Sequence, residues 1–200
     1  MRLIIEGDSI TSAGRNYEDK HDLGLGYASM IQNELKDVKV INLGVSGNRS
    51  FELLDRFHDT LNLKPDIITI LIGVNDVWHS KAGKKAPTTP KDYHDNMIKI
   101  LDLIKEKTPN VKVFLLEPFI LEIGHVKEDW IPDLREIQGM VKDLSHQYNH
   151  VFIPLQDTFN KKSSEDGMRM EDYLKDGVHP TPLGHKLISD TLLSVLKKYI

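Results

Sequence analysis

The sequence contains no cysteine. Disulfides, thiolate metal sites and cysteine nucleophiles are therefore excluded together. A large excess of either charge is absent as well. The sequence has 26 Lys and Arg residues and 30 Asp and Glu residues, which gives a formal net charge of −4. No basic block is long enough to follow a phosphate backbone, so nucleic acid is not expected as a partner.

Long hydrophobic runs are missing at the amino terminus. Residues 3–5 are apolar and Glu6 follows them directly. A signal-peptide core needs about 7–15 apolar residues, and a membrane-spanning helix needs about 20. The sequence thus predicts no membrane partner, and it predicts a cytoplasmic location or secretion from a longer precursor.

The 200 residues, 40% of them hydrophobic, are typical of a globular protein. A chain of this size is expected to form one domain over residues 1–200 and to bury roughly 70% of its unfolded surface. β-rich apolar runs predict five strands, at residues 3–5, 38–43, 67–72, 111–116 and 151–155. Four of these runs lack polar alternation, which is typical of a parallel sheet covered by helices on both faces.

Helical patterns separate the predicted strands. A Thr-Pro pair, which favours a helix start, precedes the apolar stripes of residues 91–104 and 183–196. Further helices are expected over residues 25–36, 51–62 and 134–148. The β/α alternation predicts a three-layer α/β/α sandwich around a five-stranded parallel sheet.

Three stretches do not fit this scaffold and are expected to be long, largely polar loops. They cover residues 11–23, 77–88 and 119–132, and each follows the carboxyl end of a predicted strand. Ligands of open α/β sheets bind at that edge, so we expect the functional residues there.

Ser9 follows the first predicted strand, where a nucleophile would be exposed at the sheet edge. An isolated serine at such a place is more often a helix cap. Asp176 and His179, however, lie three residues apart before the last helix. This spacing lets the carboxylate accept from one ring N–H, so that the other ring nitrogen can take a proton from a serine hydroxyl.

Acyl transfer also needs hydrogen-bond donors for the developing oxyanion. Gly44 follows the second predicted strand and permits close backbone approach, although a plain turn glycine explains it equally well. Asn75 follows the third strand, where its amide would face the same crevice or simply form a turn.

Four blocks, Gly7-Asp8-Ser9-Ile10, Gly44, Gly73-Val74-Asn75-Asp76 and Asp176 to His179, resemble those of the GDSL or SGNH hydrolases in order and spacing. The resemblance covers nearly the whole chain and implies a flavodoxin-like sandwich. It implies that Ser9 is the nucleophile, His179 the general base and Asp176 its orienting partner. It further implies an oxyanion hole made of the Ser9 and Gly44 backbone N–H groups and the Asn75 amide.

Further stretches are similar to bacterial carbohydrate esterases of the acetylxylan esterase type: Gly24 to Tyr27, Gly73 to Trp78, and Glu117 to Phe119. Trp78 and Trp130 fall in the expected loops and could either stack on a sugar or anchor their loops on the core. The loop histidines His21, His79 and His125 lack metal-ligand spacing, so no metal is expected.

The sequence therefore predicts a serine esterase that hydrolyses short-chain acyl esters, in particular acetyl esters of carbohydrates, without a metal or cofactor. A lysophospholipase or thioesterase of the same family is the alternative. Two non-enzymatic alternatives are a catalytically silent carbohydrate-binding protein and a receiver-like signalling module with Glu6, Asp8 and Asp76 as its acidic cluster. The partner is expected to be a small-molecule or oligosaccharide ester, and a homo-oligomer is compatible with the sequence.

Overall fold

A computed structural model describes residues 1–83, 87–165 and 167–200. Five strands form one parallel sheet in the order β2-β1-β3-β4-β5. Their bounds are β1 Arg2–Gly7, β2 Lys39–Asn42, β3 Ile67–Leu71, β4 Lys112–Leu116 and β5 Val151–Ile153. All five lie where the apolar runs predict them.

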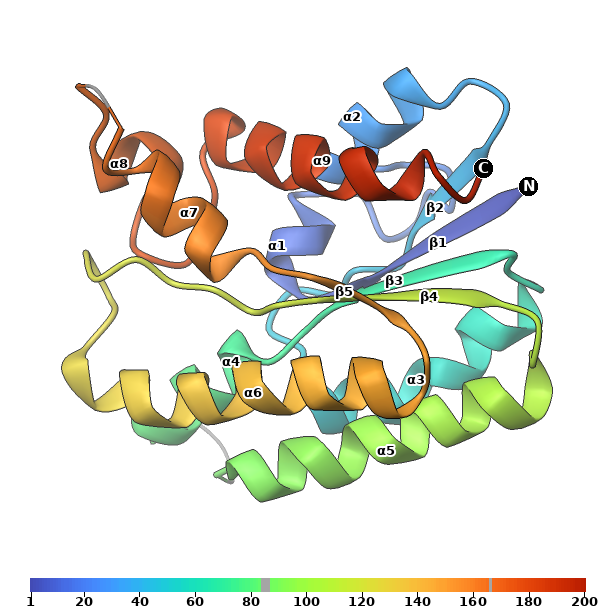
Figure 1. Cartoon of the computed structure of the whole chain (residues 1–200), viewed down its shortest axis with the longest axis horizontal. Helices are drawn as coiled ribbons and strands as arrows, with labels where there is room; N and C mark the ends of the chain where they lie inside the picture. Colours follow the sequence, from blue (N-terminus) through green and yellow to red (C-terminus); the bar gives the residue numbers. More distant parts are fainter. Residues whose placement is uncertain (84–86, 166) are drawn as a thin grey trace.

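Helices cover both faces of the sheet (Figure 1). Helices α2 and α9 lie on one face, and helices α3, α5 and α6 lie on the other. Their bounds are α2 Tyr27–Glu34, α3 Ser50–Asn62, α5 Pro90–Lys107, α6 Ile131–Gln147 and α9 Pro182–Leu196. Every residue of the central strand β3 is buried, as expected for a strand covered on both sides. The predicted three-layer α/β/α sandwich is confirmed.

Both Thr-Pro pairs begin helices as predicted. The Thr89 hydroxyl accepts a hydrogen bond from the Asp92 N–H at the start of α5, and the Thr181 hydroxyl accepts one from the Gly184 N–H at the start of α9. These contacts satisfy N–H groups that the first helical turn leaves without a carbonyl partner.

The expected long loops are partly helical. Helix α4 Val74–Lys81 occupies residues 77–81 of the stretch expected as a loop over residues 77–88, and residues 84–86 of that stretch lie outside the described residues. The expectation was wrong because Val74 and Val77 are buried and hold a short helix against the core. The stretch 119–132 contains the 3-10 helix η1 Glu128–Trp130 and the first turn of α6.

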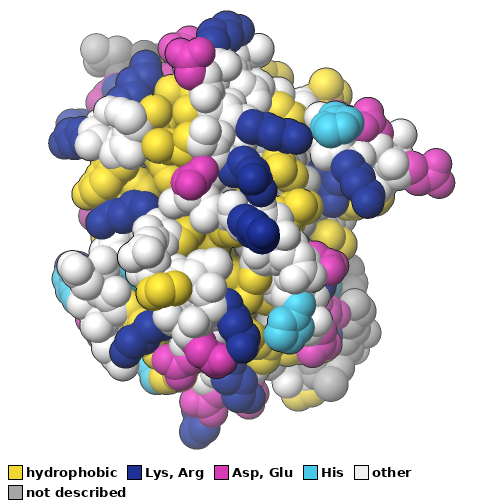
Figure 2. Space-filling view, turned by 90° about the vertical axis from the view of Figure 1, so that its right-hand side faces the viewer, with side chains coloured by type: hydrophobic (Ala, Val, Ile, Leu, Met, Phe, Trp, Pro, Cys, Tyr) yellow, Lys and Arg dark blue, Asp and Glu magenta, His cyan; other side chains and the backbone are white. Residues whose placement is uncertain are grey.

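Three further short helices were not predicted. They are α1 Ser9–Ser12, α7 Gln156–Lys162 and α8 Met170–Tyr173. In Figure 1, α1 and α4 lie at the carboxyl ends of the strands, and the two chain termini lie at the opposite end of the molecule. Figure 2 shows that opposite face, where Lys and Arg side chains are interspersed with Asp, Glu and hydrophobic groups.

Candidate active site

Ser9 is the first residue of helix α1, immediately beyond strand β1. The Asp8 side chain caps this helix, because its Oδ1 accepts a hydrogen bond from the Ile10 N–H at 2.9 Å. The chain leaves β1 toward the α2 face of the sheet and leaves β3 toward the opposite face. Ser9 therefore lies at the point where the connections diverge, which is the usual ligand-binding crevice of such sheets.

His179 and Asp176 meet Ser9 from the loop between α8 and α9. Ser9 Oγ lies 3.0 Å from His179 Nε2, and His179 Nδ1 lies 2.7 Å from Asp176 Oδ2. Both distances are those of hydrogen bonds. The arrangement lets the carboxylate hold a proton on Nδ1, which leaves Nε2 free to accept the serine proton.

The second oxygen of Asp176 is held by the backbone. Its Oδ1 accepts from the Val178 N–H at 3.0 Å and from the His179 N–H at 2.8 Å. Partial burial alone would raise the pKa of Asp176, but the hydrogen bonds from the His179 backbone and ring and from Val178 outweigh it and lower the pKa. Asp176 is therefore ionised at neutral pH, as an orienting carboxylate must be.

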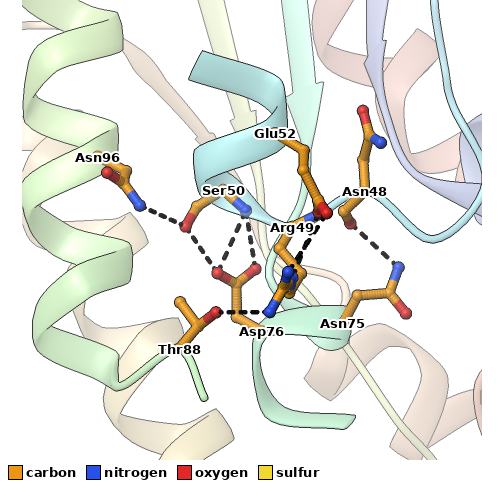
Figure 3. Close-up of polar contacts among 8 residues, drawn as sticks. All are labelled: Asn48, Arg49, Ser50, Glu52, Asn75, Asp76, Thr88 and Asn96. Atoms are coloured by element: carbon orange, nitrogen blue, oxygen red, sulfur yellow. Dashed lines mark hydrogen bonds and ion pairs between the residues drawn. The ribbon is translucent and has the colours of Figure 1, made fainter. Parts of the chain in front are cut away.

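Asn75 lies in the first turn of α4 and is 4% exposed. One N–H of its side-chain amide donates to the Asn48 carbonyl at 3.1 Å (Figure 3). An amide carries two N–H donors, so the second remains for another acceptor.

Gly44 is packed tightly against helix α1. A Cβ at this position would lie 2.5 Å from the Ser12 backbone nitrogen, so no larger residue fits without moving that backbone. The Gly44 N–H donates to the Asn42 side chain at 2.9 Å. This predicted oxyanion donor thus already has an acceptor in the free protein, and an oxyanion would have to share or replace it.

Trp78 lies beside His179, and the two ring centres are 5.8 Å apart. On other sides it contacts Trp130 at 5.4 Å and His125 at 5.5 Å. Trp130 is only 3% exposed, which fits a loop anchor rather than a sugar-stacking face. Of the two tryptophans, only the half-buried Trp78 offers ring surface to a substrate.

A cavity of about 590 Å³ has both Ser9 and His179 in its wall. Sequence reasoning missed two of its lining residues, Leu25 and His185. Leu25 is 86% exposed, and a lone leucine after a polar loop gave no signal of such a role. Burial lowers the pKa of His185 to about 4, so its ring is neutral at neutral pH. His185 lies within a predicted helix, and nothing in that helical pattern indicates that its side chain lines a cavity.

The acidic residues considered for a receiver-like module have structural partners. Glu6 pairs with Arg56 at 2.7 Å, and Asp76 accepts hydrogen bonds from the Ser50 N–H and hydroxyl. Burial raises the pKa of both Asp8 and Asp76 to about 7, although hydrogen bonds from neighbouring groups oppose the shift. Within the described part of the chain, no group of three or more His, Asp or Glu side chains is arranged to hold a metal ion.

Over residues 1–83, 87–165 and 167–200, no helix is both long and apolar enough to span a bilayer.

The fold and the residues at its carboxyl edge define an α/β acylhydrolase. The chain belongs to the GDSL-like Lipase/Acylhydrolase family, whose model matches residues 6–187, and it is an esterase. This confirms the resemblance found in the sequence and rules out the receiver-like alternative.

Among known proteins, an acetylxylan esterase from Geobacillus stearothermophilus is 29% identical, over 96% of this chain and 92% of that protein. Its solved structure, Axe2, superposes with a TM-score of 0.84 at 26% identity, covering 96% and 92% of the two chains. A structure from Parabacteroides merdae, a candidate GDSL-like lipase, reaches a TM-score of 0.89 at 32% identity, covering 96% and 94%. An isoamyl acetate-hydrolyzing esterase from Saccharomyces cerevisiae is 23% identical over 99% of this chain and 87% of that protein.

Proposed function

We propose that the protein is a serine esterase that removes short acyl groups, in particular acetyl groups, from carbohydrate esters. The observation that carries the proposal is the continuous contact from Ser9 Oγ through the His179 ring to Asp176, at 3.0 Å and 2.7 Å. Structures of Axe2 include catalytic mutants at a serine and at an aspartate, which supports the same chemistry here.

In the first step, Ser9 Oγ attacks the ester carbonyl carbon while its proton moves to His179 Nε2. The resulting oxyanion accepts hydrogen bonds from the Ser9 N–H and from the second N–H of Asn75. The Gly44 N–H also donates to the oxyanion, either by giving up its hydrogen bond to the Asn42 side chain or by sharing its proton between the two acceptors. His179 then protonates the leaving alcohol oxygen as the carbon–oxygen bond breaks, which leaves an acyl group on Ser9.

In the second step, His179 takes a proton from a water molecule, and the water oxygen attacks the acyl carbon. The second tetrahedral intermediate uses the same donors. Its collapse returns the proton to Ser9 Oγ and releases the carboxylic acid.

Two features support a short acyl group and a sugar alcohol. Two relatives are named for acetyl esters, one of xylan and one of isoamyl alcohol. Trp78 lies beside His179 and offers part of an aromatic ring, a surface that packs well against the C–H face of a sugar. Leu25, Pro180 and Pro182 line the cavity and add further apolar wall.

The proposal is tested with aryl esters from acetate to octanoate and with acetylated xylo-oligosaccharides and isoamyl acetate. We expect kcat/KM to be highest for the aryl acetate. We also expect the protein to release acetyl groups from the xylo-oligosaccharides. Both activities should be lost in Ser9→Ala. A long-chain acylhydrolase would instead gain about fourfold per buried methylene, from roughly 0.8 kcal/mol each. A steady rise to octanoate would contradict the short-acyl assignment, and turnover of isoamyl acetate alone would contradict the carbohydrate assignment.

A further inference from the structure

The orientation of the Asn75 amide depends on the segment that follows strand β2. The acceptor for its first N–H is the backbone carbonyl of Asn48, at 3.1 Å, and Asn48 lies just before helix α3. Because the amide group is planar, the position of this carbonyl determines where the second N–H points. The segment around Asn48 therefore sets the direction of the oxyanion donor.

Asn48 is itself held by the side chain of Arg56, which lies about two turns further along, in α3. Arg56 Nε donates to Asn48 Oδ1 at 2.7 Å, and Arg56 Nη2 donates to the Gly7 carbonyl at 3.2 Å. Gly7 ends strand β1, two residues before Ser9. One planar guanidinium thus joins the strand that carries the nucleophile to the residue that orients Asn75.

The guanidinium is anchored by a buried carboxylate. Arg56 Nη1 donates to Glu6 Oε2 at 2.7 Å, and the other Glu6 oxygen accepts from the Thr60 hydroxyl. Glu6 is 0% exposed. Hydrogen bonds between charged groups are short and strong, and the fixed fork of arginine allows three acceptors to be held at once. A lysine could not hold all three.

Ser50 fixes the same segment from its other side. The Ser50 N–H donates to both oxygens of Asp76, at 3.0 and 3.2 Å, and the Ser50 hydroxyl donates at 2.6 Å (Figure 3). Asn96 from helix α5 donates to the Ser50 hydroxyl at 3.1 Å. Residues 48–50 are therefore held at both ends by side chains, at one end by the half-buried Arg56 and at the other by the buried Asp76.

We propose that Asn48 and Arg56 are positioning residues that hold the Asn75 amide in its oxyanion-binding direction. This inference rests on the proposed function, in which Asn75 is an oxyanion donor. Arg56 acts through the Asn48 side chain, so its effect is on transition-state stabilisation and appears in kcat rather than in KM.

The test is a double-mutant cycle between Asn48→Ala and Asn75→Ala, measured on an aryl acetate. Asn48→Ala keeps the backbone carbonyl but removes the acceptor for Arg56. We expect kcat to fall by about 10- to 100-fold at unchanged KM, because a displacement of about 1 Å can cost this much. In the Asn75→Ala background, adding Asn48→Ala should lower kcat only slightly further. Asn48→Asp, which keeps an acceptor oxygen, should have a kcat close to that of the parent protein.

A matched control is Glu117→Gln. Glu117 also lies at the carboxyl edge of the sheet, where it accepts hydrogen bonds from the Leu155 and Gln156 N–H groups at 2.9 Å each. This variant replaces a charged acceptor by a neutral one in partly buried hydrogen bonds away from Asn75, so it should lower thermal stability without changing kcat.

The outcomes separate the positioning inference from the proposed function. If Asn75→Ala lowers kcat by about 10²–10³ and the Asn48→Ala loss is equal in both backgrounds, the positioning role is wrong and the oxyanion role stands. If Asn75→Ala leaves kcat unchanged, both roles are wrong. If Asn48→Ala does not fold, Arg56→Lys keeps the positive charge beside Glu6 and should show the same Asn75-dependent loss. A loss independent of Asn75 in that variant overturns the inference.

Discussion

Replacing Asp176 with asparagine should reverse the tautomer of His179. The side-chain amide has one acceptor and one donor end, whereas both Asp176 oxygens act as acceptors. With its oxygen toward the Val178 and His179 N–H groups, the amide would direct its NH₂ at His179 Nδ1. The ring proton would then lie on Nε2, which could no longer accept the proton of Ser9.

The opposite amide orientation is the productive one, but it places NH₂ against two backbone N–H groups. Leaving each buried donor without an acceptor costs about 1–3 kcal/mol, so the productive orientation is disfavoured by roughly 2–6 kcal/mol. At 1.36 kcal/mol per factor of ten, kcat should fall by about 30-fold to about 10⁴-fold. A Ser-His-Asp site with the same substitution loses about 10⁴-fold, which lies at the upper end of this range.

The measurement combines kcat on an aryl acetate with ¹⁵N spectroscopy of the histidine ring, which distinguishes the two tautomers. Thermal unfolding provides the control that the variant is folded. An Asp176→Asn variant that stays within tenfold of the parent, or that keeps its proton on Nδ1, would refute the reasoning and move the orienting role elsewhere.

Two other predictions concern the triad and the buried acids. Ser9→Ala and His179→Ala should each lower kcat by about 10⁴–10⁶, and the double variant should be little worse because the residues act as one unit; additive losses in steady-state assays would contradict the assignment. Asp8 and Asp76 have pKa values raised to about 7 in the folded protein, so the folded state binds more protons than the unfolded state above about pH 4. Stability in urea should therefore decrease from about pH 6.5 to pH 8, a range in which His185 is largely neutral in both states, and a flat profile would show that both carboxylates ionise normally.

The sheet could be predicted from sequence because its signals are local. Apolar runs such as residues 67–72 mark the strands within the run itself, and the Thr-Pro pairs supply the caps at the helix starts. The candidate site could be predicted for a related reason. Ser9 and Asn75 follow strands, and the carboxyl ends of parallel strands meet at one edge.

The remaining features depend on long-range contacts. Helix α4 was missed because its polar residues, Asn75 and Asp76, are buried against partners from another segment, so no helical apolar stripe marks it. The burial of Trp130 depends on its contact with Trp78 across the site. Arg56 contacts Glu6, which lies 50 positions away in the sequence. A single sequence gives no signal for a contact at that separation.

The loop that carries Asp176 and His179 is joined by backbone hydrogen bonds to the segment after β4. Leu121 N–H donates to the Gly177 carbonyl, and His125 N–H donates to the Asp176 carbonyl, at 2.9 Å each. Both segments lie outside the strands and the long helices, and irregular segments of this kind open at lower free energy than a central sheet. Asp176 and His179 can therefore move away from Ser9 while the sheet stays folded. Under mild denaturation this enzyme should lose activity before it loses its structure.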